Sequence, residues 1–132
     1  MSAAERVIRI VAAVIRDQAG RSLLVRKHGA TVFQQPGGKR DPGDVDELAT
    51  LARELREELG CELRRGSARL LCHCSAPAAN EPGHVVEAAV YTVDVHGAIA
   101  AQAEIAELRW IDPVAPDVPV ARLSREHILP LL

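Results

Sequence analysis

One helix, marked at both of its ends, constrains the fold of this chain more than any other feature. Between Val45 and Leu59 the apolar residues recur with a helical period and share one face. Those residues are Leu48, Leu51, Ala52, Leu55 and Leu59. Asp44 and Glu47 have the spacing of a capping box, and Gly60 stands where a left-handed residue ends a helix. The pattern predicts an amphipathic helix at residues 45–59 that lays its apolar face on a core.

Extended segments lie on both sides of this helix. Residues 7–15 are rich in β-branched side chains, and a turn at 17–20 leads into a second strand at 22–27, so we expect a hairpin. Further strands are expected at residues 68–74, 85–95 and 104–111. A second helix is expected at 121–131, after a Pro-rich stretch. Several strands with two dissimilar helices predict one α/β domain with a mixed sheet between the helices.

The composition limits the partners more than the fold. Of the 132 residues, 48% are apolar, but only Phe33, Tyr91 and Trp110 are aromatic, so the core must be aliphatic. A net charge of −2 argues against binding to a nucleic acid polymer or an anionic membrane. The apolar run at residues 7–15 contains Arg9 and is too short to span a membrane, and the odd number of cysteines fits reduced thiols. We therefore expect a cytoplasmic monomer or homodimer that acts on a small molecule.

Three glutamates crowd one side of the predicted helix. Glu54, Glu57 and Glu58 stand at i, i+3 and i+4 and span about 100° of arc beside the apolar stripe. A solvated acidic face, helped by Arg53 four residues before Glu57, is the simpler explanation. Two facts weaken it, because the helix dipole disfavours acids in the last turn and because like charges repel. A hard divalent cation such as Mg2+ would resolve both problems.

A glycine-containing loop precedes the helix. The sequence Pro-Gly-Gly at residues 36–38 permits a close approach of the backbone to a ligand, and Lys39 and Arg40 can meet phosphate oxygens. By itself, the same sequence is typical of a turn with solvated charges. The loop and the acidic helix together favour a site for a metal ion and a phosphate.

Taken together, residues 38–61 resemble the Nudix box of the Nudix hydrolases. The family pattern is Gly, five residues, Glu, seven residues and then Arg-Glu-apolar-x-Glu-Glu-x-Gly-apolar. The segment from Arg53 to Cys61 matches every specified position, with Cys61 counted as apolar. The opening half departs twice, since Asp44 replaces Glu and eight residues separate it from Arg53. Asp44 and Glu47 therefore compete for the role of the first acid.

The resemblance implies a Nudix α/β/α sandwich around a central mixed sheet. It also implies hydrolysis of a nucleoside diphosphate that is linked to another group. Glu57 and Glu58 would be the principal ligands of Mg2+, or of Mn2+, with Glu54 as a further ligand or as the base that orients water. The carbonyl of Gly38 would complete the metal shell, and Arg53 would hold the carboxylates by ion pairing.

The general base varies within this family and can lie outside the box. Glu104 stands at the start of the last predicted strand, where some members place a catalytic glutamate. Glu107 and Glu81 are its competitors, and an ordinary surface acid explains Glu104 equally well. A base must also come within about 3 Å of the proton that it removes.

The substrate is the part of the function that the sequence determines least. A small chain of this kind is most similar to the antimutator nucleoside triphosphate pyrophosphohydrolases, which release a nucleoside monophosphate and pyrophosphate. Candidates to bind the base by stacking or through an amide are Phe33, Gln34, Gln35 and Asn80. Phe33 is more typical of a core residue than of a base-stacking residue. Nucleotide sugars, ADP-ribose and dinucleoside polyphosphates are alternative substrates, and a nucleotide-sensing module without activity is an alternative function.

Overall fold

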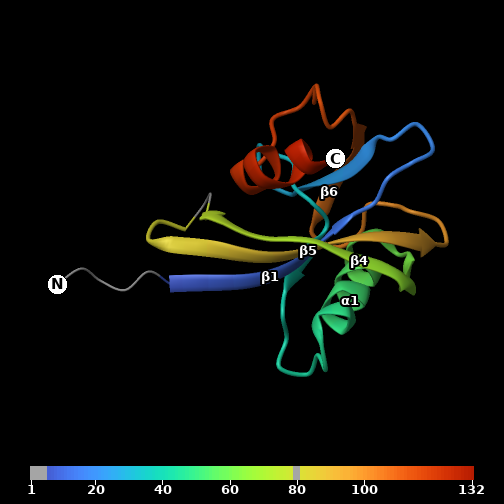
Figure 1. The fold of residues 1–132 in the computed structure, drawn as a ribbon, viewed down its shortest axis with the longest axis horizontal. Helices are drawn as coiled ribbons and strands as arrows, with labels where there is room; N and C mark the ends of the chain where they lie inside the picture. The colour runs from blue at the N-terminus through green and yellow to red at the C-terminus, as the bar shows by residue number, and fades with distance from the viewer. Residues whose placement is uncertain (1–5, 79–80) are drawn as a thin grey trace.

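A mixed four-stranded sheet runs through the middle of the computed structural model, which describes residues 6–78 and 81–132 (Figure 1). Its strands are β1 (Arg6–Val14), β3 (Gly37–Lys39), β4 (Glu62–Pro77) and β5 (His84–His96). They lie in the order β3-β1-β5-β4, with β1 parallel to β5 and antiparallel to β3. A second, two-stranded sheet pairs β2 (Ser22–Lys27) antiparallel to β6 (Ile105–Ile111).

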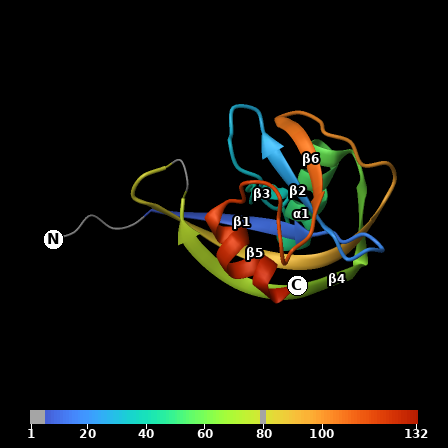
Figure 2. The ribbon, with the colours of Figure 1, turned by 90° about the horizontal axis from the view of Figure 1, so that it is seen from above.

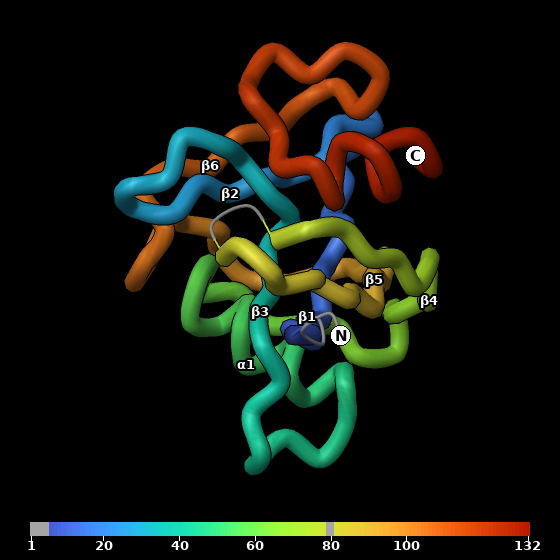
Figure 3. Tube along the Cα trace, turned by 90° about the vertical axis from the view of Figure 1, so that its left-hand side faces the viewer, coloured from blue at the N-terminus to red at the C-terminus, as the bar shows by residue number. Residues whose placement is uncertain are grey.

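Helical segments cover the two faces of the larger sheet. Helix α1 (Glu47–Leu59) lies on one face, and the C-terminal segments η1 (Ser124–Ile128) and η2 (Leu129–Leu131) lie on the other, as Figures 2 and 3 show. This arrangement confirms the α/β/α sandwich with a mixed sheet. The described residues contain no helix that is long and apolar enough to cross a membrane.

The alternation of side chains along β1 explains how one strand serves both layers. Neighbouring residues of a strand point to opposite faces of the sheet. Val11 and Ala13 accordingly pack in one buried cluster with Leu55 of α1. Ala12 and Val14 pack in a second cluster with Ile128 of the C-terminal segment. Both clusters are mainly aliphatic, as the shortage of aromatic residues requires.

The prediction of a hairpin from β1 and β2 is right for the turn and wrong for the two strands. The turn closes as predicted, since the Asp17 N–H donates to the Arg21 carbonyl and Arg16 forms a bridge with Ser22. The two strands then separate into different sheets. Leu23 and Leu24 are both fully buried and pack in different core clusters, so β2 needs apolar contacts on each of its faces.

The two ends of α1 differ in how well the sequence predicted them. Gly60 ends the helix in the left-handed conformation, with φ 72°, and donates its N–H to the Arg56 carbonyl, as expected. The capping box of Asp44 is wrong, because the N-cap is Asp46, whose carboxylate accepts from the Ala49 N–H at 2.8 Å. Asp44 is engaged elsewhere, in a contact with Arg53.

The remaining elements are present, but with different bounds. β4 begins at Glu62 rather than at residue 68, because it pairs along the whole of the long strand β5. The pairing register shifts between Arg64 and Arg69, so the residues between them interrupt the ladder without ending the strand. The expected C-terminal helix is a π-helical turn followed by a 3-10 turn. Pro130 lies in that last turn and has no N–H to continue an α-helical ladder.

Candidate active site

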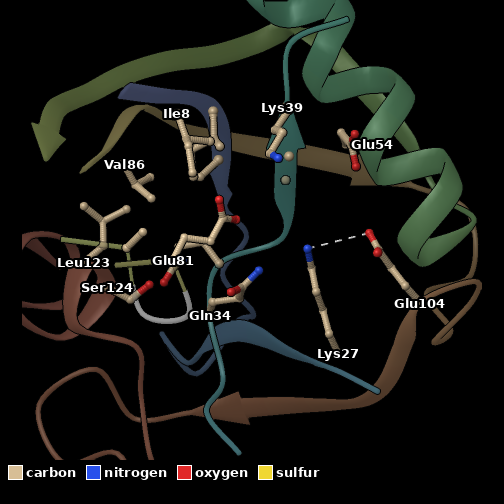
Figure 4. Close-up of a pocket in the computed structure, with 16 residues that line it drawn as sticks. Ile8, Lys27, Gln34, Lys39, Glu54, Glu81, Val86, Glu104, Leu123 and Ser124 are labelled. Atoms are coloured by element: carbon tan, nitrogen blue, oxygen red, sulfur yellow. Dashed lines mark ion pairs between the residues drawn. The ribbon is translucent and has the colours of Figure 1, made fainter. Parts of the chain in front are cut away.

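A cleft of about 430 Å³ opens beside β3 and has two chemically different ends (Figure 4). Charged residues line one end, namely Lys27, Lys39, Glu54 and Glu104. Apolar residues line the other end, namely Ile8, Val86 and Leu123. The volume lies in the range of about 300–1,000 Å³ that is typical of small-molecule sites.

Three carboxylates converge at the charged end. One oxygen each from Glu54, Glu58 and Glu104 lies within 4.8 Å of the others. Glu54 and Glu58 come from the last turns of α1, one turn apart, whereas Glu104 immediately precedes β6. Helix periodicity therefore places two of these acids, and the tertiary fold brings the third.

Glu58 is the most deeply buried of the three. Glu58 is 1% exposed, and its Oε1 accepts from the Gly37 N–H at 3.0 Å. Its Oε2 is buried and has no hydrogen-bond partner among the described residues. Burial raises the pKa of Glu58 to about 7. An unpaired carboxylate oxygen in a buried place is costly, and a bound cation would remove that cost.

Two glycines let the β3 backbone approach these acids. A Cβ at Gly38 would lie 2.5 Å from the Glu54 carboxyl carbon. Gly37 has φ 145°, and a Cβ there would lie 2.1 Å from the Val11 carbonyl oxygen. Both glycines are therefore required by close packing, and Gly37 also by its positive φ.

Arg53 connects the loop, the helix and the acids. It donates to both carboxylate oxygens of Asp44, at 3.2 and 2.9 Å, and to Glu54 Oε1 at 2.9 Å. It also donates to the Lys39 carbonyl at 3.1 Å and lies 3.6 Å from Glu57 Oε1. Arg53 thus contacts three carboxylates, those of Asp44, Glu54 and Glu57, and its role of holding them in place stays a prediction.

Asp44 and Glu47, the two candidates for the first acid of the Nudix box, lie in different surroundings. Asp44 accepts from Arg53 and from the Thr50 hydroxyl, and the hydrogen bond from Arg53 holds the pKa of Asp44 well below its usual range. Glu47 instead accepts from the Tyr91 hydroxyl at 2.6 Å and lines a different pocket. Asp44 is thus the acid that contacts the Arg53 network.

Glu57 lies at the edge of the cluster rather than within it. Its side chain is 55% exposed and forms an ion pair with Arg53. The carboxylates that converge are those of Glu54, Glu58 and Glu104. The role of Glu57 as a principal metal ligand stays a prediction.

Glu104 is held beside the helix by its backbone and its side chain. Its carboxylate lies 3.7 Å from Lys27 Nζ, and its carbonyl accepts from the His28 N–H at 2.9 Å. Gln102, two residues earlier, donates its N–H to the Glu58 carbonyl at 3.0 Å, which ties the loop to the end of α1. Of its competitors, Glu107 pairs with arginines outside this cluster, and Glu81 lines the far end of the cleft.

The predicted substrate residues separate into three groups. Lys39, Gln34 and Gln35 line the cleft, and Gln35 donates to the Ala13 carbonyl at 3.2 Å. Arg40 is exposed beyond Lys39 and is not among the residues that line the cleft. Phe33 is 4% exposed and packs in a core cluster, so we do not carry it forward as a base-stacking residue. Asn80 lies outside the described residues.

Lys27 was missed by the sequence analysis. It ends β2, lines the cleft and faces Glu104 (Figure 4). No motif marks it, because its neighbours in the site come from distant segments of the chain. A basic residue at the end of a strand was the one available signal.

The chain matches known proteins over nearly all of its length. The family model described as "NUDIX domain" matches residues 7–132. A MutT NUDIX hydrolase from Burkholderia pseudomallei is 27% identical, with a TM-score of 0.82 over 97% of this chain and 99% of that one. The ORF135 protein of E. coli is 28% identical, with a TM-score of 0.77 over 96% and 89%. A UDP-X diphosphatase shares the fold at 22% identity, with a TM-score of 0.79 over 98% of this chain and 63% of that one.

Proposed function

The chain belongs to the Nudix family and is a pyrophosphohydrolase that acts on a nucleotide derivative, and on this premise we propose that its substrate is a nucleoside triphosphate. The products would be the nucleoside monophosphate and pyrophosphate, and the reaction would require Mg2+, which Mn2+ can replace. The observation that supports the metal requirement most directly is the unpaired, buried Oε2 of Glu58 beside Glu54 and Glu104.

The residues at the charged end of the cleft fit a hard divalent cation. All three converging groups are carboxylates, and Mg2+ prefers oxygen ligands. Glu54 and Glu58 would hold the ion, with the Gly38 carbonyl and Glu57 as further expected ligands. When bound, the ion supplies positive charge and Lewis acidity at the phosphate oxygens.

The protein side chains would position the substrate and move the proton. Lys39 and Lys27 line the cleft beside the acids and would meet phosphate oxygens, as Arg40 would at the entrance. A water molecule attacks one phosphorus atom, the bond from that atom to the bridging oxygen breaks, and Glu104 accepts the proton of the water. Glu54 would orient the water, and Arg53 would keep Glu54 in place.

A triphosphate is favoured over the larger substrate classes. The cleft has one apolar end, which suits one nucleoside, whereas a dinucleoside polyphosphate presents two. All three glutamates of the box are retained, which favours an enzyme over a nucleotide sensor. A single domain over residues 1–132, a cytoplasmic location and a monomeric or homodimeric state stay predictions from the sequence.

The test is a substrate panel with defined metal content. Nucleoside triphosphates, nucleotide sugars, ADP-ribose and dinucleoside polyphosphates are incubated with Mg2+, with Mn2+ or with a chelator. We expect pyrophosphate and a monophosphate from a triphosphate, and loss of turnover with the chelator. Turnover that survives the chelator would contradict the metal requirement. Faster hydrolysis of another substrate class would show that the proposed triphosphate substrate is wrong.

Matched variants separate the site from general effects. Glu58→Gln should lower kcat by a factor of about 10² or more, since one ligand of the ion loses its charge. Glu87→Gln serves as the control, because Glu87 is an exposed acid that pairs with Arg9 and lines a different pocket. Full activity of Glu58→Gln would show that Glu58 is not a ligand of the ion.

A further inference from the structure

The loop between β5 and β6, which carries Glu104, is anchored on the end of α1. Gln102 donates its N–H to the Glu58 carbonyl at 3.0 Å, and Ala100 donates its N–H to the Leu59 carbonyl at 3.0 Å. Both carbonyls belong to the last turn of the helix, where the helix itself has no donors left for them. The loop therefore supplies the donors that a further helical turn would supply.

Gln102 also begins the tight turn that contains Glu104. The Ile105 N–H donates to the Gln102 carbonyl at 3.0 Å, which closes a β-turn from Gln102 to Ile105. Ala103 and Glu104 are its two central residues, and Ala103 has φ 52°. A short turn closed by a hydrogen bond has little freedom, so a displacement of Gln102 moves Glu104 with it.

The side chain of Gln102 rests on a glycine at the end of the helix. A Cβ at Gly60 would lie 2.4 Å from Gln102 Nε2, 3.0 Å from Cδ and 3.3 Å from Oε1. The amide of Gln102 thus occupies the space that a side chain at Gly60 would need. Gly60 also has the left-handed φ of 72° that ends the helix. Glycine at this position therefore serves the loop as well as the helix.

These anchors bring the Glu104 carboxylate to the other acids. One of its oxygens lies within 4.8 Å of oxygens of Glu54 and Glu58, and its carboxylate lies 3.7 Å from Lys27 Nζ (Figure 4). Glu104 is exposed, so burial does not fix its side chain. A general base must come within about 3 Å of the proton that it removes, and a displacement of about 1 Å is costly in rate. The position of the turn therefore decides whether the carboxylate reaches the proton.

We propose that Gln102 is a positioning residue for Glu104, an inference that rests on the proposed function, in which Glu104 accepts the proton of the attacking water. The N–H and the amide of Gln102 hold the turn against α1, and the turn presents the carboxylate to the cleft. A purely structural role would give Gln102 an effect on stability alone. A positioning role gives it an effect on kcat that depends on Glu104.

The experiment is a double-mutant cycle between Gly60 and Gln102, measured on the substrate that the panel shows to be hydrolysed fastest. The new Cβ in Gly60→Ala displaces the amide that Gln102→Ala deletes, so both variants remove the same contact. We expect each to lower kcat by a factor of about ten with little change in KM. The double variant should lose no more than either single variant, because the contact can be lost only once.

Gly97→Ala is the matched control for backbone strain. Gly97 lies in the same loop and also has a positive φ, 93°, but the nearest atom that a Cβ there would meet is Cys61 Cα at 4.0 Å. Gly97→Ala and Gly60→Ala should both lower the urea midpoint of unfolding. Only Gly60→Ala should lower kcat. Mg2+ affinity, measured by calorimetry, should stay near the wild-type value in both variants.

The link to Glu104 is tested in the Glu104→Gln background. There Gln102→Ala should cause no further loss of kcat, because the carboxylate that it positions is absent. A further loss, or losses that add between Gly60→Ala and Gln102→Ala, would overturn the inference. Wild-type kcat in Gln102→Ala together with a large loss in Glu104→Gln would refute the inference and leave the proposed function intact. Full activity of Glu104→Gln would refute the proton-accepting role of Glu104, and the inference with it.

Discussion

Replacement of Glu58 by glutamine should remove a large part of the pH dependence of stability in the metal-free protein. Burial raises the pKa of Glu58 from its ordinary value of 4.5 to about 7 in the folded state. Between these two pH values the folded protein holds a proton that the unfolded chain has released. The free energy of unfolding therefore falls as the pH rises through this window.

The size of the effect follows from the difference between the two pKa values. Each pKa unit corresponds to about 1.4 kcal/mol, so Glu58 lowers the free energy of unfolding by up to about 3 kcal/mol between pH 4.5 and pH 8. Glutamine does not titrate, and its Oε1 can still accept from the Gly37 N–H. Its amide nitrogen would be an unpaired donor in place of Oε2, but this cost is the same at both pH values and cancels in the comparison.

The assay is urea unfolding of the wild type and Glu58→Gln at pH 5 and pH 8 with a chelator present. We expect the wild type to lose about 2.5 kcal/mol more than the variant between the two pH values, because pH 5 already lies inside the window. Addition of Mg2+ at pH 8 should stabilise the wild type and leave Glu58→Gln nearly unchanged. Parallel pH profiles for the two proteins would refute the account of Glu58 as a buried, unpaired carboxylate.

Substitutions at three further positions test the elements around the site. In Gly38→Ala the new Cβ meets the Glu54 carboxyl at 2.5 Å, so we expect Glu54 to move and Mg2+ affinity, measured by calorimetry, to fall with kcat. Arg53→Lys cannot keep both contacts to Asp44, and thermal unfolding should show a loss of about 1–3 kcal/mol; an unchanged Tm would mean that Lys restores the network. Ala103, just before Glu104, is the one non-glycine residue with positive φ (52°) among the described residues. Ala103→Val should cost about 1–2 kcal/mol in urea unfolding and Ala103→Gly much less, whereas equal effects of the two would show that φ at this position is not strained.

Local patterns were sufficient for the elements whose cause is local. The helix at residues 45–59 was predicted within two residues, because apolar spacing and the left-handed Gly60 act within a few residues of each other. The closing half of the Nudix box was recognisable for the same reason, since Glu54 and Glu58 share one helix face. The N-cap was misplaced because Asp44 and Asp46 both suit a cap, and only the contact with Arg53 decides between them.

The sequence by itself determined the helix, the acids on it, the family and the layered fold. Only the tertiary structure decided which residues meet at the site. Lys27 and Glu104 come from segments far from the box, and strand pairing between β2 and β6 brings them together. The tertiary structure also decided that β2 leaves β1 after the turn, and that Oε2 of Glu58 finds no hydrogen-bond partner in the described part of the chain. Pairing and burial depend on contacts between distant residues, and no short pattern records them.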